Sequence, residues 1–407
     1  MKVLLVNCVY GNGSTGKILS SLHHGLIRDG WDSFVRYARG PLSDEKNVRK
    51  LSSEKIVQFQ ALCSRLTGYT YSCSPMTTSR LKGDIKKLKP DVVNLHCVNA
   101  NTVNIAEILT FLKKNKIPTV VTAHAEFVYT GGCGHSLECN KWKSGCSKCP
   151  QFHTIDSQLP VSYFSDRCRH YWKALSKAYA DFPQLRLTGV SPWLVSRIKQ
   201  SPFFTNNQVW CTLNGVNTVI FHPREASHLR KLHEIPSGGR IYLHVTPNFR
   251  SPLKGGKYML DFANIIRQHR PDDRLIIIGY NDDDENLLPN IISIRHINNQ
   301  TELAEYYSLA DVTLVPSSRE TFSMVTAESL CCGTPVVGFK AGGPESICTR
   351  GKALFVEYGD LEAFVNSALS IEKDHTISTF YIPLFSEESM VTQYEAVYNS
   401  LNYGETD

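Results

Sequence analysis

The feature that most constrains the fold is an alternation of short β-rich runs with helical patterns, which occurs twice along the chain. In the first half, apolar runs such as Lys2–Cys8, Val92–Leu95 and Thr119–Thr122 alternate with segments of helical periodicity. The same alternation restarts at Arg240–Val245 and continues to Pro335–Gly338. This layout is typical of parallel sheets that are covered by helices. We therefore predict an α/β chain built from two Rossmann-like domains.

A stretch rich in turn formers and charged residues separates the two halves. It runs from Asn214 to Gly239, and the chain of 407 residues is long enough for two domains that each bury a core. We place an N-terminal domain at residues 1–213 and a C-terminal domain at residues 214–385. The amphipathic segment 386–407 is predicted to form a terminal helix that packs on one of them, and we expect it to pack on the first.

Composition and charge exclude several classes of protein. Hydrophobic residues make up 42% of the chain and charged residues 20%, which is typical of globular proteins. The net charge of +6 is mild, and its basic runs concentrate between Arg80 and Lys116. Aromatic residues are not interleaved with these runs, which argues against nucleic-acid binding. A basic face could meet an anionic membrane surface, although such runs are more often solvated helix faces.

The apolar segments of the sequence are too short to span a bilayer, and Met1 opens straight into a predicted strand. We expect a cytoplasmic protein, either free or peripheral on the inner face of the cytoplasmic membrane. The thirteen cysteines are then expected to be free thiols, metal ligands or both, because disulfides are rare in that compartment.

The glycine-rich stretch GNGSTGKI starts at Gly11, directly after the first predicted strand. It matches a Walker A loop up to its last position, where Ile18 replaces the Ser or Thr that would bind Mg²⁺. Nucleotide hydrolysis is therefore not expected. The backbone N–H groups around Gly13 and Gly16 can still cradle a phosphate at the start of the following helix. The alternative is an ordinary strand-to-helix turn in which the glycines only permit tight packing.

Two carboxylates in the second half, Glu320 and Glu328, lie eight positions apart. We expect Glu320 just before a helix and Glu328 inside it, with Phe322 and Ser323 supplying N–H groups at the helix N-terminus. Such a pair can flank a ligand that carries both hydroxyls and a diphosphate. Taken alone, paired glutamates on a helix are more often surface charges.

Several motifs, in this order, resemble those of retaining glycosyltransferases of family four. That family has the GT-B architecture, in which two Rossmann-like domains face each other across a cleft. The resembling segments are Asn214-Gly-Val-Asn217, which has Asn217 where Asp is more common; Phe249-Arg250-Ser-Pro-Leu-Lys254; the E-x7-E pair Glu320 and Glu328; and Gly342-Gly343-Pro344-Glu345. The resemblance covers nearly the whole chain.

The resemblance implies roles for the residues of the second half. Glu320 would bind hydroxyls of the donor sugar, and Glu328 would bind the ribose of the nucleotide. Arg250 and Lys254 would neutralise the departing diphosphate, where fixed cations lower the barrier as negative charge develops. A catalytic metal is then not expected.

In the first half, the resemblance implies that the loop around Gly13 and Gly16 approaches the donor diphosphate. His124 ends a predicted strand at the edge of the sheet where open α/β sheets bind ligands. The family places a His or Asp there against the donor sugar, so His124 is a catalytic candidate. A histidine with a purely structural role is the alternative.

Four cysteines lie close together in the segment 131–151, namely Cys133, Cys139, Cys146 and Cys149. They fit one tetrahedral zinc, and the loop is long, polar and rich in glycine, with little to order it except a crosslink. We therefore predict a structural zinc site, with His135 and His153 as substitute ligands. An iron–sulfur cluster or packed reduced thiols are the alternatives. The pattern around these cysteines also resembles a branch of the family that acts in bacterial surface-polysaccharide assembly, including the colanic acid type.

These observations favour a retaining, hexosyl-type glycosyltransferase that uses a nucleotide-sugar donor. We expect it to build an O-antigen of lipopolysaccharide, a capsule or an exopolysaccharide on a lipid-linked saccharide acceptor. A transferase with a soluble acceptor and an inactive nucleotide-sugar-binding protein of the same fold are the alternatives. A dehydrogenase is disfavoured, because the expected acidic residue does not follow the glycine loop.

Overall fold

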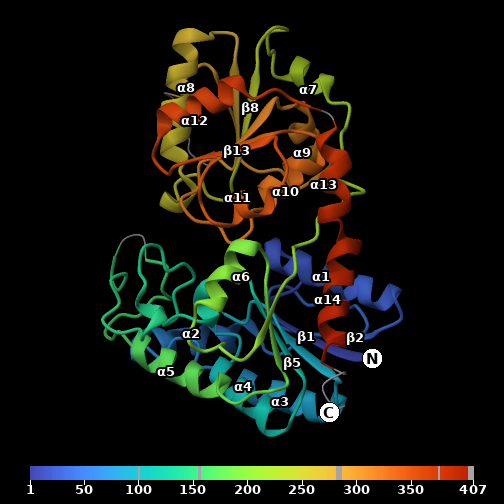
Figure 1. The fold of residues 1–407 in the computed structure, drawn as a ribbon, viewed down its shortest axis with the longest axis vertical. Coiled ribbons are helices and arrows are strands. Elements are labelled where there is room, and N and C mark those ends of the chain that lie inside the picture. Colours follow the sequence, from blue (N-terminus) through green and yellow to red (C-terminus); the bar gives the residue numbers. More distant parts are fainter. Residues whose placement is uncertain (100, 155–156, 281–286, 375, 402–407) are drawn as a thin grey trace. The chain divides into compact units, whose positions relative to one another are not determined.

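The computed structural model describes residues 1–407 except 100, 155–156, 281–286, 375 and 402–407. The chain forms two compact units (Figure 1). The first domain comprises Met1–Leu213 with the tail from Met390, and the second domain comprises Asn214–Ser389. The last six residues of the expected terminal helix 386–407 lie outside the described part of the chain.

The first domain is built on a seven-stranded parallel sheet. Its strand order is β3-β2-β1-β4-β5-β6-β7, so β1 lies between β2 and β4. The sequences of most strands are nearly continuous apolar runs, because helices cover both faces of a parallel sheet. Their bounds are β1 (Lys2–Val9), β2 (Asp32–Arg39), β3 (Val48–Lys50), β4 (Val92–Leu95), β5 (Thr119–Ala123), β6 (Leu185–Gly189) and β7 (Gln208–Cys211).

Helices connect these strands and bury apolar faces against the sheet. In α4, for example, Ile105, Ile108, Leu109 and Leu112 recur at helical spacing and are buried, and the side chain of Asn104 caps the first turn. The helices of this domain are α1 (Gly13–Arg28), α2 (Glu54–Thr67), α3 (Pro75–Leu88), α4 (Ile105–Lys114), η1 (Glu126–Val128), η2 (Lys141–Lys143), α5 (Cys168–Tyr179), α6 (Pro192–Lys199) and α14 (Glu387–Asn399).

The terminal helix α14 packs into the core of the first domain. Val391 lies so close to Gly25 of α1 that a Cβ added there would come within 2.3 Å of its Cγ2. The Asn94 side chain of β4 donates a hydrogen bond of 2.7 Å to the hydroxyl of Tyr398. These contacts bury Tyr398 completely and pack α14 against β4 and α1 of the first domain.

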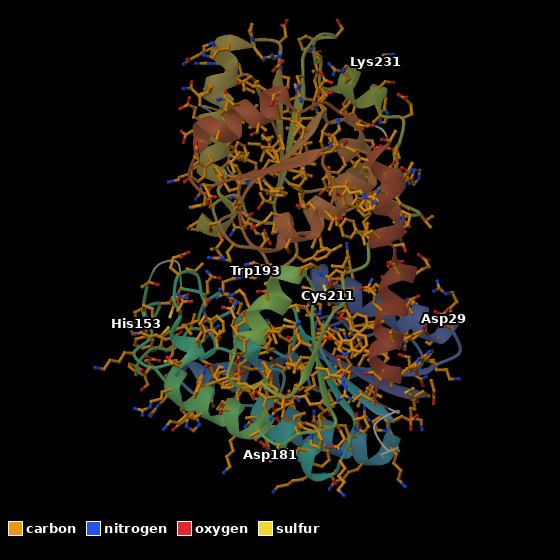
Figure 2. All side chains as sticks on the ribbon, viewed as in Figure 1. Asp29, His153, Asp181, Trp193, Cys211 and Lys231 are labelled. Atoms are coloured by element: carbon orange, nitrogen blue, oxygen red, sulfur yellow. The ribbon has the colours of Figure 1, made fainter. Side chains whose placement is uncertain are left out.

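The second domain is built on a six-stranded parallel sheet of order β10-β9-β8-β11-β12-β13. Its strands are β8 (Ile241–Val245), β9 (Arg274–Ile278), β10 (Ile291–Ile294), β11 (Val312–Val315), β12 (Val336–Phe339) and β13 (Ala353–Val356). Its helices are α7 (Ser227–Leu232), η3 (Pro252–Lys254), α8 (Gly256–His269), α9 (Gln300–Leu309), α10 (Met324–Cys331), α11 (Gly343–Ile347), α12 (Leu361–Ser370) and α13 (Ile377–Phe385). Tyr242, Phe262 and Phe339 belong to the buried hydrophobic core of this domain. Figure 2 shows side chains filling the space between the sheet and its helices.

The order of the strands marks where each sheet can bind a ligand. In an open α/β sheet, ligands bind outside the carboxyl ends of the strands at the point where the strand order reverses. That point lies between β1 and β4 in the first domain and between β8 and β11 in the second. The prediction of two Rossmann-like parallel sheets is thus confirmed. Across the described residues, the helices are too short or too polar to cross a membrane.

Candidate functional site

The second domain brings Lys254 and Glu320 into contact at the point where its strand order reverses. Lys254 ends η3 in the loop after β8, and Glu320 lies in the loop after β11. The Nζ atom of Lys254 lies 2.5 Å from Oε1 of Glu320, which also accepts a hydrogen bond of 3.0 Å from the Ser317 hydroxyl. Both charged side chains are partly exposed. A cation and a carboxylate are thus presented together to any ligand at this edge.

Glycines after Lys254 allow the two loops to approach this closely. Gly255 adopts a φ of +69°, and a Cβ there would come within 2.2 Å of the Pro316 carbonyl oxygen. A Cβ at Gly256 would come within 2.3 Å of the Phe249 carbonyl oxygen. A side chain at Gly255 would push the loop after β8 away from Pro316 and separate Lys254 from Glu320. A side chain at Gly256 would distort the loop itself, because Phe249 belongs to the same loop.

A third loop holds the backbone of Glu320. Its N–H donates to the carbonyl of Ala341, and its carbonyl accepts from the N–H of Gly343, at 3.0 and 2.9 Å. A Cβ at Gly343 would come within 2.5 Å of the amide nitrogen of Phe322. The motif Gly342-Gly343 therefore fixes the peptide groups that lead from Glu320 into α10.

Glu328 lies inside α10, as predicted, and accepts a hydrogen bond of 3.1 Å from the hydroxyl of buried Tyr307. Burial and this carboxylate raise the pKa of Tyr307 well above its usual range. Ser323 caps the helix by accepting from the N–H of Thr326, in a backbone conformation with φ of +80° that non-glycine residues rarely adopt. The side chains of Phe322 and Ser323 are both buried, so only backbone groups are left to serve the predicted N–H contacts.

Arg250 is exposed at the start of the same loop as Lys254, where its N–H donates to Asn248 at 3.2 Å. His244, at the end of β8, is buried and donates from Nδ1 to the carbonyl of Leu314. Burial, together with the positive charge of Lys254, lowers the pKa of His244 to about 4. The positive charge of this edge therefore comes from Arg250 and Lys254 at neutral pH, and suits an anionic ligand such as a diphosphate.

In the first domain, the glycine-rich loop lies directly at the end of β1. Gly11 and Gly13 have φ angles of +70° and +63°, and α1 begins without a side-chain cap. The N–H of Gly11 donates to the carbonyl of Gly16, and a Cβ at Gly16 would come within 3.1 Å of Val9. Ile18 is buried, so it places no polar atom at the loop. The geometry fits a phosphate cradle without the Mg²⁺ ligand of a P-loop.

His124 follows β5 and lies next to His96, which follows β4. Nδ1 of His96 lies 3.1 Å from Nε2 of His124, and the two rings stack at 5.4 Å. The ring of Tyr394 of α14 also packs against the ring of His96. Nε2 of His96 has no hydrogen-bond partner among the described residues. Burial lowers the pKa of both histidines, that of His124 to about 4. The loops after the paired strands β4 and β5 thus bring His96 and His124 into direct contact.

Because these histidines are held neutral in the folded protein, we expect its free energy of unfolding to fall at acid pH. The unfolded pKa of about 6.5 exceeds the folded value of about 4 for His124 and His244, so the unfolded chain binds more protons between these values. Stability is fully present above pH 6.5 and is lost as pH falls toward 4. At pH 5 we expect a loss of about 2 kcal/mol per histidine relative to pH 7. Urea unfolding at both pH values measures it.

His244→Asn keeps a side-chain donor near the position of Nδ1 and should reduce this loss by about one histidine's share. His296→Asn, a substitution of an exposed histidine, is the matched control. An unchanged pH dependence in His244→Asn would show that His244 is not held neutral in the folded protein.

The predicted zinc site is not supported by the positions of its cysteines. Across the described residues, including Cys133, Cys139, Cys146 and Cys149, no group of three or more His, Cys, Asp or Glu side chains is placed to hold a metal ion. Cys149 instead contacts Cys168, a residue that the sequence did not single out, and this contact lowers the pKa of Cys149 to about 7. Asp166 joins the two by accepting from both backbone N–H groups, at 2.7 and 2.9 Å.

Polar contacts also hold this loop, for which the sequence predicted little order besides a crosslink. Fully buried Glu126 lies 2.6 Å from Nε of Arg197 of α6, and accepts hydrogen bonds from the Tyr129 hydroxyl and the Ser136 N–H. The Arg197 guanidinium also packs over the ring of Trp142 at 4.8 Å. These polar contacts order the loop from within. The sequence carried no signal for them beyond a carboxylate two positions after His124.

Comparisons with known proteins agree with this geometry. Residues 240–374 match the family model described as Glycosyl transferases group 1, and these residues include Lys254, Glu320 and Glu328. The chain is 25% identical over 210 residues to N-acetyl-alpha-D-glucosaminyl L-malate synthase of Bacillus anthracis, a match of 47% of this chain. The chain spans about half (54%) of that relative's length.

Solved structures resemble the chain over nearly its whole length. Sucrose-phosphate synthase of Thermosynechococcus elongatus has a TM-score of 0.69 and 16% identity, covering 98% of both chains. HepE of Anabaena, in complex with UDP-glucose, has a TM-score of 0.64 and 14% identity, covering 98% of this chain and 100% of its own. At such identities the likeness shows the fold alone, which is the GT-B fold of two Rossmann-like domains.

Proposed function

We propose that the chain is a retaining glycosyltransferase that transfers a sugar from a nucleotide-diphosphate donor. The observation that carries this proposal is the contact of Lys254 with Glu320 at the point where the strand order of the second domain reverses. The contact lies within the part of the chain that matches the glycosyl transferases group 1 model. It presents a cation for the leaving diphosphate and a carboxylate for the sugar hydroxyls at one place.

Each residue of the second domain then has a role. Arg250 and Lys254 bind the diphosphate and stabilise the charge that develops on it as the glycosidic bond breaks. Glu320 accepts hydrogen bonds from the donor sugar, and Glu328 accepts them from the ribose. The N–H groups of Phe322 and Ser323 add donors at the start of α10. In the first domain, the resemblance assigns a phosphate contact to the loop at Gly13 and Gly16 and a sugar contact to His124.

For the acceptor, we propose a lipid-linked saccharide of O-antigen, capsule or exopolysaccharide synthesis. The cysteine pattern of residues 133–149 supports this, because it resembles the surface-polysaccharide branch of the family. The exposed basic residues of α3, such as Lys86 and Lys87, also suit an anionic membrane surface. The names of the malate synthase and the sucrose-phosphate synthase favour a second candidate, a small soluble acceptor. Salt-dependent binding to anionic vesicles distinguishes the two.

Nucleotide binding tests the proposal. We expect calorimetry with UDP, GDP, ADP and TDP to show preferential binding of one nucleotide. Arg250→Ala should weaken that binding roughly 10- to 100-fold, since a charge-assisted hydrogen bond contributes about 1.5–3 kcal/mol. Glu328→Ala should weaken it as well through the loss of the ribose contact.

Arg267→Ala removes an exposed arginine from α8 and is the matched control, with unchanged affinity. If Arg250→Ala bound the nucleotide as tightly as the wild type, the proposed donor site would be wrong. Tight binding without any hydrolysis or transfer of the sugar would instead favour the inactive nucleotide-sugar-binding protein.

A further inference from the structure

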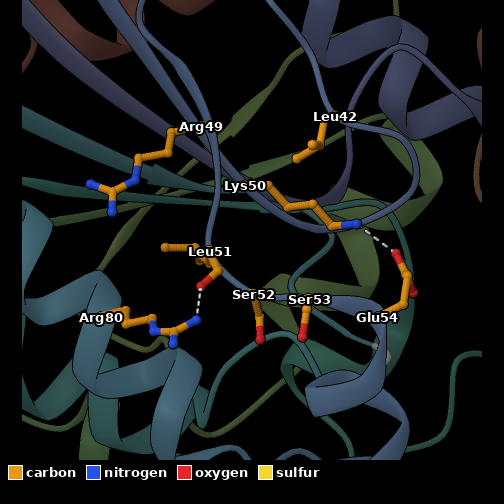
Figure 3. Close-up of a pocket in the computed structure, with 8 residues that line it drawn as sticks. All are labelled: Leu42, Arg49, Lys50, Leu51, Ser52, Ser53, Glu54 and Arg80. Atoms are coloured by element: carbon orange, nitrogen blue, oxygen red, sulfur yellow. Dashed lines mark hydrogen bonds and ion pairs between the residues drawn. The ribbon is translucent and has the colours of Figure 1, made fainter.

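The first domain contains a pocket that the proposed donor site does not use. It lies at the carboxyl end of β3, where the chain turns through Leu51, Ser52 and Ser53 into α2, and its volume is about 470 Å³ (Figure 3). Arg49, Lys50 and Arg80 line it together with the two serines. β3 is an edge strand of the sheet, so the pocket lies apart from the point between β1 and β4 where the strand order reverses.

Ser52 has a hydroxyl that lacks a partner. The residue is only 6% exposed, and its Oγ makes no hydrogen bond within the described structure. A buried polar atom of this kind is costly unless a water or a ligand satisfies it. In Figure 3, the hydroxyls of Ser52 and Ser53 point to the same side of the pocket.

The N-terminus of α2 opens at the same place. Ser53 is its N-cap residue, but no side chain caps the first turn of this 14-residue helix. The Glu54 carboxylate, the acidic group of that turn, is held away by Lys50 Nζ at 2.7 Å and by the N–H of Gly40 at 2.8 Å. The helix therefore presents backbone N–H groups and the positive end of its dipole without an internal anion to satisfy them.

The charges around the pocket favour an anion. The residues that line the pocket include three cations, Arg49, Lys50 and Arg80, and one carboxylate, that of Glu54. Arg80 donates one N–H to the carbonyl of Leu51 at 2.9 Å, which orients its guanidinium along the pocket. Its remaining donors suit two oxygens of one phosphate.

Arg49 also keeps its charge for a ligand. Its pair with Asp84 is long, 3.3 Å, and its side chain is 65% exposed, so that pair is weak. Asp84 is engaged more closely by buried Arg36, at 2.5 Å.

We propose that this pocket binds a phosphate monoester or diphosphate group. Arg49 and Arg80 pair with its charge, the Ser52 hydroxyl donates to one oxygen, and the first turn of α2 donates backbone N–H groups. In the transferase the pocket holds the phosphate group of the acceptor, and this last assignment rests on the proposed function. The phosphate belongs either to a soluble acceptor or to a lipid-linked one.

Calorimetric titration with pyrophosphate at low salt tests the pocket. The titration is made on the Lys254→Ala protein, so that the donor site does not compete. Arg80→Ala should weaken binding about tenfold or more, as expected for a charge-assisted bidentate contact. Ser52→Ala should weaken it severalfold without lowering the melting temperature, because the wild-type hydroxyl has no internal partner. Lys173→Ala, which removes an exposed cation from α5, should leave binding unchanged.

Equal pyrophosphate affinity in the parent, Arg80→Ala and Ser52→Ala proteins would overturn the proposal, as would an equal loss in Lys173→Ala. Vesicles of phosphatidic acid identify the source of the phosphate. Binding to vesicles that is lost in Arg80→Ala indicates a lipid-linked ligand, and pyrophosphate binding without vesicle binding indicates a soluble one. Because nucleotide binding by the second domain is measured separately, failure of this pocket is distinguishable from failure of the transferase.

Discussion

Replacing Lys254 by alanine is expected to lower the rate of sugar transfer about 10²–10³-fold, the size of effect seen when one fixed stabilising group is removed from a developing negative charge. The Nζ atom of Lys254 lies 2.5 Å from Glu320, on a loop that Gly255 allows to pack against Pro316, just after β11. A cation held in this way needs no reorganisation as the diphosphate departs. Initial rates of donor hydrolysis or transfer, at saturating donor, measure the change.

The control for this variant is Lys257→Ala, which removes an exposed lysine from the first turn of α8. Its rate should match that of the wild type, since its charge lies over the ring of Tyr258. A double-mutant cycle with Glu320→Gln separates catalysis from simple loss of an ion pair. If Lys254→Ala retained more than about a third of the wild-type rate, its assignment to the leaving group would be wrong.

The strands and helices that the sequence predicted are those with strong periodic signals. Runs such as Lys2–Cys8 and Arg240–Val245 are apolar because both faces of each sheet are covered, and they were recognised on that basis. The edge strands β3, β7, β10 and β13 were missed because they are short and partly exposed. Helical periodicity predicts a helix over Tyr163–Asp181, but α5 spans only Cys168–Tyr179 and begins where the Asp166 side chain accepts the N–H of Cys168.

The candidate site was predictable where motif and topology coincide. Lys254 and Glu320 were chosen from sequence patterns, and the order β8-β11 brings their loops together. The contact between His96 and His124 was not predictable, because it joins residues from two loops through the pairing of β4 with β5. The cysteine spacing suggested a metal, but spacing alone does not show where each thiol points. The Cys149 thiol contacts that of Cys168, which lies nineteen positions further along the chain.

The largest effect on stability is expected from Glu126→Ala. Glu126 is fully buried and lies 2.6 Å from Arg197, whose side chain is 15% exposed. The variant leaves the guanidinium without its carboxylate and removes the acceptor for Ser136 and Tyr129. Breaking a buried pair in this way typically costs about 3–5 kcal/mol, since the remaining charge stays desolvated. Thermal unfolding should show the first domain melting roughly 6–12 °C lower.

Two further variants show whether this loss comes from the unpaired charge. Glu138→Ala removes an exposed carboxylate from the same loop and should change stability by less than about 0.5 kcal/mol. A double variant, Glu126→Gln with Arg197→Met, removes both charges while keeping the volume. It should recover part of the stability, because two neutral groups of similar shape avoid the cost of one buried charge. If the double variant were less stable than Glu126→Ala, the loop would depend on the attraction between the two charges, and the desolvation argument would be wrong. A Glu126→Ala protein that melts with the wild type would show that the loop is ordered by its other contacts, such as those of Trp142.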